Sequence, residues 1–296
     1  MNINIKNHLQ NIFGLSSANY DKYPNLWMKN IELFIPQLFE LISVNTNYIP
    51  YIIDINDIIL QNKECNIDAK IIQSLFYKYG SDKATNYFEF YAFILNKFKD
   101  NNIRLLEVGL GTNDTTLIST MGKGKYKCGG SLRSFRDYLP HSFIYGADVD
   151  KNCLFNEQNI NTFFVDQLNI GTFDNLYQMC GNKKFDVIID DGLHCISANL
   201  NTIIFALQNI NNNGVIIVED IPIDRIKAYK TIDYILHTGN KNNYKRIIDF
   251  IQAINVGIQN AIASDIANFN SENLMSSILD YNNDTEFLLN YIDENY

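Results

Sequence analysis

The chain has 296 residues, of which 46% are hydrophobic and 19% are charged. This composition is typical of a folded globular protein and excludes disordered and collagen-like chains. The length suits one α/β domain with an appendage. The formal net charge of -9 argues against nucleic acid or an anionic membrane surface as the main partner, because both attract basic surfaces.

Cysteine usage and hydropathy indicate the environment of the protein. The five cysteines lack a C-x-x-C spacing and stand at Cys65, Cys128, Cys153, Cys180 and Cys195. An odd, scattered set predicts reduced thiols in a cytoplasmic protein, without a disulfide framework or a zinc site. The first residues lack the apolar core of a signal peptide, and no apolar run reaches membrane-spanning length. The sequence therefore predicts a soluble protein.

Three regions are expected along the chain. Residues 1–75 carry apolar side chains near helical spacing, interrupted at Pro36. We interpret them as a helical appendage or as the contact of a homo-oligomer, either a dimer or a tetramer; a lid or substrate wall is the alternative. Residues 76–260 form the main domain, and residues 261–296 form a helical tail.

Short apolar runs alternate with segments of helical periodicity in the main domain. The runs that we predict as strands begin at Arg104, Phe143, Thr162, Phe185 and Gly214. Ser131 and Ser197 are typical N-caps of two intervening helices, and the turn at residues 211–214 ends the second of these helices. This alternation predicts a doubly wound parallel sheet in an α/β fold.

Among the predicted strands, the one at residues 185–189 has the most polar end. This buried run ends in Asp190 and Asp191, Gly192 turns the chain, and His194 follows. A buried strand has no structural use for two acids and an imidazole at its carboxyl end. In open α/β sheets, that edge is where ligands bind.

A second predicted strand ends in Glu219 and Asp220. If it neighbours the strand that ends in Asp190 and Asp191, four carboxylates lie in one crevice, because adjacent strands are about 4.8 Å apart. Such crowding is costly unless a cation or a proton is shared. Surface caps or a salt-bridge cluster are the alternative interpretation.

The first and second strands also end in acids. Glu107 ends the first strand, and a glycine-containing turn follows, but Asp114 stands where the dinucleotide fingerprint needs its third glycine. A ligand without phosphates therefore fits this turn better. Asp148 ends the second strand, where an acid typically binds ribose hydroxyls; the alternative is a helix or turn cap by Asp148 or Asp150.

Seven short motifs link these strand ends to a known family. They are Gly80-Ser-Asp-Lys, Leu106-Glu-Val-Gly109, Gly130-Ser-Leu-Arg133, Gly146-Ala-Asp148, Asp166-Gln167, Ile189-Asp-Asp-Gly-Leu-His194 and Val218-Glu-Asp220. With these motifs in this order, the chain resembles class I S-adenosylmethionine (SAM)-dependent methyltransferases. More narrowly, it resembles the metal-dependent sugar O-methyltransferases of the mycinamicin and macrocin type. The family favours Ser where Leu193 stands.

The resemblance implies a Rossmann-like fold, SAM as cofactor and a magnesium ion or another hard divalent cation. The cofactor-binding residues that it implies are Glu107, Gly109, Ser131, Asp148, Asp166, Gln167 and Asp190. The magnesium ligands that it implies are Asp191, Glu219 and Asp220, and His194 matches the general base. A set of oxygen ligands favours Mg²⁺, then Ca²⁺ or Mn²⁺, over zinc.

These features predict a Mg²⁺-dependent O-methyltransferase that acts on a sugar hydroxyl. The substrate is expected to be a nucleotide-linked sugar of a surface polysaccharide or a glycoside. Four alternatives stay open: a metal-independent methyltransferase of an amine or small phenol, an NAD-dependent oxidoreductase, a non-haem iron hydroxylase and a non-catalytic Rossmann scaffold. The missing third glycine disfavours the oxidoreductase. Iron usually requires two histidines, and only His194 stands near the acids.

Overall fold

The computed structural model describes residues 65–114, 116–117 and 127–221. The helical region expected before residue 65 and the expected tail 261–296 lie outside the described residues. Among the helices of the described part, none is both long enough and apolar enough to cross a membrane.

Six strands form one sheet in the order β3-β4-β2-β1-β5-β6. Their bounds are β1 Arg104–Val108, β2 Phe143–Asp148, β3 Asn156–Glu157, β4 Ile160–Phe164, β5 Phe185–Asp190 and β6 Ile210–Val218. All neighbours are parallel except β3 and β4, which are antiparallel. Strands β2 and β4 extend the sheet on one side of β1, and the chain then crosses to β5 and β6 on the other side. This reversal at β1 is the switch point at which doubly wound sheets bind ligands.

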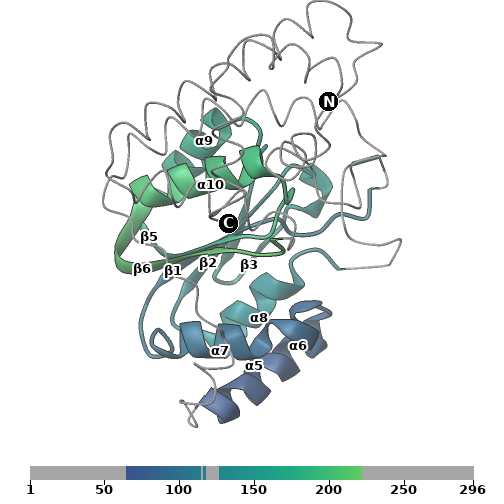
Figure 1. Cartoon of the computed structure of the whole chain (residues 1–296), viewed down its shortest axis with the longest axis vertical. Coiled ribbons are helices and arrows are strands. Elements are labelled where there is room, and N and C mark those ends of the chain that lie inside the picture. Colours follow the sequence, from purple (N-terminus) through teal and green to yellow (C-terminus); the bar gives the residue numbers. More distant parts are fainter. Residues whose placement is uncertain (1–64, 115, 118–126, 222–296) are drawn as a thin grey trace, which may run out of the picture. The chain divides into compact units, whose positions relative to one another are not determined.

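Helices cover both faces of the sheet (Figure 1). The helices on one face are α5 Cys65–Tyr79, α6 Lys83–Asn86, α7 Phe88–Asn96 and α8 Gly130–Tyr138. Those on the other face are α9 Gly171–Met179 and α10 Ile196–Asn209, and a short 3₁₀ helix, η1 Lys151–Cys153, follows β2. The predicted doubly wound, Rossmann-like α/β fold is therefore confirmed.

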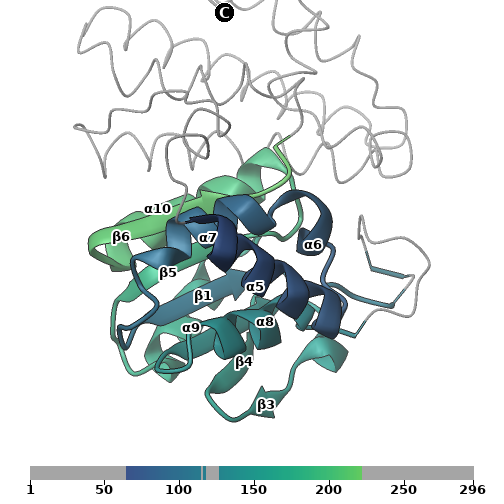
Figure 2. The same cartoon turned by 90° about the horizontal axis from the view of Figure 1, so that it is seen from below.

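Successive side chains of β1 point to opposite faces of the sheet, so the core has two layers. Leu105 packs with Ile72 and Phe135 on the side of α5 and α8, the face that Figure 2 presents. Leu106 packs with Phe173 and Phe205 on the side of α9 and α10. All of these side chains are buried, and full burial of each contributes about 1.5–3 kcal/mol. These layers hold the strand ends in place.

The predicted boundary between residues 75 and 76 falls inside α5. This helix contacts α6, α7 and α8, and its side chains Ile72 and Phe76 are completely buried. Residues 65–79 therefore pack as part of the sheet domain. The described residues fall into two compact units: those from Cys65 to Leu193 and Asn201–Asp220 belong to one, whereas His194–Leu200 belongs to the other. The boundary predicted between residues 260 and 261 lies outside the described residues.

Three local predictions were wrong. Ser197 is not an N-cap, because α10 already begins at Ile196. Ser131 is not an N-cap, because α8 begins at Gly130 and its N-cap is Gly129, in the left-handed conformation (φ 70°); the Ser131 hydroxyl donates to Glu107 instead. The turn expected at residues 211–214 lies within β6, because Ile210 already pairs with Phe185 on β5. The pairs with β5 pass from Phe185–Ile210 to Val187–Val215, so residues 211–214 form a bulge in β6, in which Asn213 is left-handed (φ 66°).

Candidate active site

The carboxyl ends of β1, β5 and β6 lie side by side. Asp190 is in register with Val108 on β1 and with Val218 on β6. The ladder continues for one more residue, since the Asp191 amide donates to the Val108 carbonyl and the Glu219 amide donates to the Asp190 carbonyl, both at 2.8 Å. The structure thus brings the acids that follow β5 and β6 to one edge, as the sequence predicts.

Gly109 allows the ends of β1 and β5 to approach closely. It has a φ of +98°, and a Cβ at this position would overlap the backbone carbonyl of Asp191. Any side chain would therefore push the end of β5 away from β1. The role expected for Gly109 beside a cofactor stays a prediction, but the structure gives it a close backbone contact.

A buried lysine lies among the acids of this edge. Lys83 is 2% exposed, and its Nζ lies 3.5 Å from Glu107 Oε1 and 2.9 Å from Glu219 Oε1. The same ammonium forms an ion pair with Asp191 Oδ2. Lys83 ends the motif Gly80-Ser-Asp-Lys, but no pattern in the sequence predicts a role for it, so this cation was missed.

Two tyrosines from the same face of the sheet bind the acids that follow β6. The Tyr91 hydroxyl, which is completely buried, donates to Glu219 Oε1. The Tyr87 hydroxyl donates to Asp220 Oδ1 at 2.6 Å. The sequence does not predict these two contacts, because helical spacing alone does not show where a phenolic hydroxyl points.

The pKa values show that Lys83 alone does not neutralise this cluster. Burial raises the pKa of Glu107 to about 7, against the opposing effect of Lys83. Burial likewise raises the pKa of Glu219 to about 8, with Lys83 opposing and Asp191 adding to the rise. Burial by itself would lower the pKa of Lys83, but Asp191, Glu107 and Glu219 together raise it well above its usual value. The edge therefore favours an additional cation or a bound proton.

The acids at this edge fit a hard divalent cation. One oxygen each of Glu107, Asp191 and Glu219 lies within 4.8 Å of the others, and so does one oxygen each of Asp191 and Asp220. Carboxylate oxygens are the ligands that Mg²⁺ and Ca²⁺ prefer. Lys83 contacts the first three acids, whereas Asp220 is exposed. A cation held by Asp191, Glu219 and Asp220 would therefore share two of its ligands with the lysine.

The acid that ends β2, Asp148, binds backbone amides. Asp148 accepts hydrogen bonds from the Leu110 amide and the Asp150 amide, both at 2.7 Å. Burial raises the pKa of Asp148, and these amides oppose the rise. Asp150 in turn caps η1 by accepting from the Asn152 amide. The contacts match the turn-cap alternative, and ribose binding by Asp148 stays a prediction.

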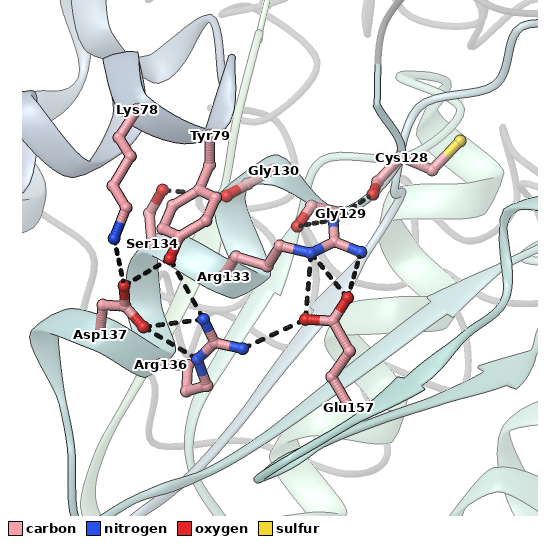
Figure 3. A network of polar contacts seen from close by, with 10 residues as sticks. All are labelled: Lys78, Tyr79, Cys128, Gly129, Gly130, Arg133, Ser134, Arg136, Asp137 and Glu157. Carbon is pink, nitrogen blue, oxygen red and sulfur yellow. Dashed lines mark hydrogen bonds and ion pairs between the residues drawn. The ribbon is translucent and has the colours of Figure 1, made fainter.

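Ser131 and Glu107 form a buried pair beneath the same edge. The Ser131 hydroxyl donates to Glu107 Oε2, so Glu107 is shared between α8 and Lys83. The start of α8 is held by Arg133, whose Nη1 donates to the carbonyls of Cys128 (2.7 Å) and Gly129 (3.1 Å) (Figure 3). The expected contact of Ser131 and Glu107 with a cofactor remains a prediction.

Gln167 connects the loop after β4 to the end of β5. Its Nε2 donates to Asp190 Oδ1 at 2.9 Å, and its Oε1 accepts from the Leu193 amide at 2.7 Å. Asp166 accepts from the Leu168 amide at 3.0 Å and so stabilises the same loop. The cofactor roles expected for Asp166, Gln167 and Asp190 stay predictions; the contacts show that these side chains order the loops around the edge.

His194 lies three residues beyond Asp191. It is buried, and its backbone is left-handed with a φ of 53°. It belongs to the second compact unit of the chain, and its role as general base stays a prediction.

The fold and the acidic edge together define a doubly wound α/β protein whose switch point carries acids that could hold a hard cation. No protein-family model matches the chain. The chain is 29% identical over 126 residues to demethylmacrocin O-methyltransferase of Streptomyces fradiae, and 31% identical over 124 residues to mycinamicin VI 2''-O-methyltransferase of Micromonospora griseorubida. The expected resemblance to sugar O-methyltransferases of this type is confirmed.

The match covers only part of each protein. It includes 42% of this chain but 29% and 28% of the two relatives, so the chain spans less than a third of their length. Among solved structures, MycE methyltransferase of the mycinamycin pathway, in complex with Mg and SAH, matches 63% of this chain and 49% of its own. Its TM-score is 0.44 at 21% identity.

Proposed function

We propose that the chain is a SAM-dependent, Mg²⁺-dependent O-methyltransferase that acts on a sugar hydroxyl. The observation that carries this proposal is the convergence of Asp191 and Glu219 at one sheet edge in a chain similar to sugar O-methyltransferases. A nucleotide-linked sugar of a surface polysaccharide or a glycoside is the proposed substrate, and the cytoplasm the proposed location.

In this proposal, SAM supplies an electrophilic methyl group, and a divalent cation lowers the pKa of a bound hydroxyl. Asp191, Glu219 and Asp220 hold the cation through carboxylate oxygens. His194 accepts the proton of the attacking hydroxyl, which contributes about 10²–10⁴-fold to the rate.

Lys83 has a positioning role in the same proposal. Because it bridges Glu107, Asp191 and Glu219, it fixes these carboxylates before any ligand binds. The proposed cofactor residues come from β1 and the residue after it, α8, β2, the loop after β4 and the end of β5; they are Glu107, Gly109, Ser131, Asp148, Asp166, Gln167 and Asp190. A preordered edge lowers the entropic cost of aligning oxygen, methyl and sulfur.

The first experiment measures binding without turnover. Titration calorimetry with S-adenosylhomocysteine, then with MgCl₂, should show one site for each ligand. Asp191→Asn should weaken Mg²⁺ binding by at least about tenfold, since it removes a ligand charge. The control Asp174→Asn replaces an exposed acid of α9 and should bind like the wild type. If S-adenosylhomocysteine does not bind, the methyltransferase proposal is wrong.

The second experiment identifies the acceptor. The protein is incubated with SAM, Mg²⁺ and a panel of nucleotide sugars and glycosides, and the products are analysed by mass for one added methylene unit. EDTA should abolish turnover and excess Mg²⁺ should restore it. His194→Ala should bind S-adenosylhomocysteine normally but lose most of the rate.

A metal-independent methyltransferase is the second candidate function. The contacts of Lys83 favour it, because an internal ammonium already lies beside Asp191 and Glu219. This alternative predicts undiminished turnover in EDTA and no calorimetric signal from MgCl₂. The same two experiments therefore separate the two functions.

The proposed assembly is a homodimer or a homotetramer formed through the apolar N-terminal region. Light scattering coupled to size exclusion measures the mass of the assembly directly. A monomer at micromolar concentration would contradict this part of the proposal without affecting the chemistry.

A further inference from the structure

Two cysteines lie together away from the acidic edge. The Sγ atoms of Cys128 and Cys153 are 2.7 Å apart, although the residues are 25 positions apart in the chain. Both are thiols in this structure. Since the bond length of a disulfide is about 2.04 Å, the two sulfur atoms need to approach by only about 0.7 Å to form one.

The backbone around Cys128 is firmly held. Its carbonyl accepts from Arg133 Nη1 at 2.7 Å, and the amide of the next residue, Gly129, donates to the Leu110 carbonyl at 3.1 Å. In Figure 3 the sulfur of Cys128 points away from the ion pairs of Arg133. Cys128 is half-buried, so a small reagent can reach it.

Cys153, the other member of the pair, is also held by hydrogen bonds. It lies in η1, where its amide donates to the Asp150 carbonyl at 3.0 Å. Its Sγ lies 3.0 Å from the Gly111 carbonyl and 3.4 Å from Asp150 Oδ2. Burial, together with the nearby Cys128 thiol, raises the pKa of the Cys153 thiol. Cys128 is therefore the thiol that meets a reagent first.

We propose that Cys128 and Cys153 are a redox modification site that forms a reversible disulfide with a low-molecular-weight disulfide as oxidant. The Cys128 thiolate attacks the reagent, one reagent thiol leaves, and a mixed disulfide forms at Cys128. Cys153 then attacks the Cys128 sulfur, and the second reagent thiol leaves. The two protein thiols lose two protons and two electrons, and the reagent is reduced to two thiols.

The disulfide would join two segments that flank the turn after β1. Cys128 directly precedes Gly129 and α8, and Cys153 contacts the Gly111 carbonyl of that turn. Since both segments are already held close together, the crosslink mainly restricts the unfolded chain. We therefore expect oxidation to raise the melting temperature of the protein by about 5 °C or more.

The test uses the full reduced chain and oxidised glutathione. After incubation, remaining thiols are alkylated, and the protein is analysed by intact mass and by non-reducing peptide mapping. The expected product has lost two hydrogens at a Cys128–Cys153 linkage and returns to the starting mass with dithiothreitol. Accumulation of glutathione on Cys128 without this linkage, or no reaction at either thiol, would overturn the proposal.

Variants distinguish a specific pair from general thiol oxidation. Cys153→Ser keeps a hydroxyl near the Gly111 carbonyl and should stop the reaction at the mixed disulfide on Cys128. Cys180→Ala changes a cysteine that is buried in the core layer on the side of α9 and α10. This variant should form the linkage like the wild type. A linkage that involves Cys180 in the wild type would contradict the assignment to Cys128 and Cys153.

Discussion

The described part of the chain contains two ionic clusters with opposite balance of charge. In the network around α8, the cations Lys78, Arg133 and Arg136 bind the acids Asp137 and Glu157 (Figure 3). At the sheet edge, Lys83 is the cation that the described residues place against Glu107, Asp191 and Glu219. The first cluster has more cations than acids, and the second has more acids than cations.

The pKa values follow this difference. Hydrogen bonds from Arg133 lower the pKa of Glu157. Burial would raise the pKa of Asp137, but hydrogen bonds from Tyr79, Lys78 and Arg136 lower it. The pKa values of Glu107 and Glu219 are raised instead. Where the pKa values of the acids are lowered, the cations already present balance their charge. Where the pKa values of the acids are raised, a further cation would be favourable, as at a ligand site.

The largest effect is expected when Lys83 is replaced. Lys83→Met removes the ammonium from three acids, so the free energy of unfolding in EDTA should fall by about 3–5 kcal/mol. Lys78→Met, in the cluster with excess cations, should leave it unchanged, because Lys78 is exposed. Urea denaturation measures both variants. Equal stability of Lys83→Met and the wild type would show that the acids at the edge do not depend on this cation.

A smaller effect is expected in the network around α8. Arg133 is buried and binds Glu157 and two backbone carbonyls. Arg133→Met should lower the free energy of unfolding by about 2–3 kcal/mol, because hydrogen bonds to charged groups contribute about 1.5–3 kcal/mol each. Arg136→Met removes a more exposed partner of the same acid and should lower the free energy of unfolding by less. If Arg136→Met costs more, Arg133 is not the centre of the network.

Per proton and per pH unit, the dependence of stability on pH is the smallest of these effects. Since the folded-state pKa values of Glu107 and Glu219, about 7 and about 8, exceed 4.5, the folded state holds more protons than the unfolded state in that interval. Stability in EDTA should therefore fall as pH rises from 4.5 towards 8, by at most about 1.4 kcal/mol per pH unit for each proton.

The two clusters respond to pH with opposite sign. The pKa of Glu157 is lowered from 4.5, so its contribution is present above that pH and is lost as pH falls through the folded-state value. Urea titrations across the range measure the slope. Glu219→Gln should flatten the decline above neutrality, whereas Glu157→Gln should leave it in place. A rise in stability with pH would contradict the raised pKa values.

Much of the site could be predicted because its parts are local in sequence. The run at residues 185–189 is apolar and β-branched, and Asp190 and Asp191 follow it directly. Parallel strands place their carboxyl ends at one edge, so the convergence of Asp191 with Glu219 followed from strand order. The position of Asp148 also predicts a turn cap as the alternative to ribose binding, and its contacts with backbone amides match that alternative.

The sequence by itself determined five of the six strands, the doubly wound class and the acids at the strand ends, because hydrophobic periodicity is a local property of the chain. The adjacency of β5 and β6 followed from the sequence only as a condition, and the short strand β3 was not predicted. Only the tertiary structure decided which partners those acids have. Lys83 is 108 residues from Asp191 and 136 from Glu219, and the two neighbouring cysteines come from the segment before α8 and from η1. Such contacts depend on how α6, α8 and η1 pack against the sheet, and no local pattern encodes the distance between their side chains.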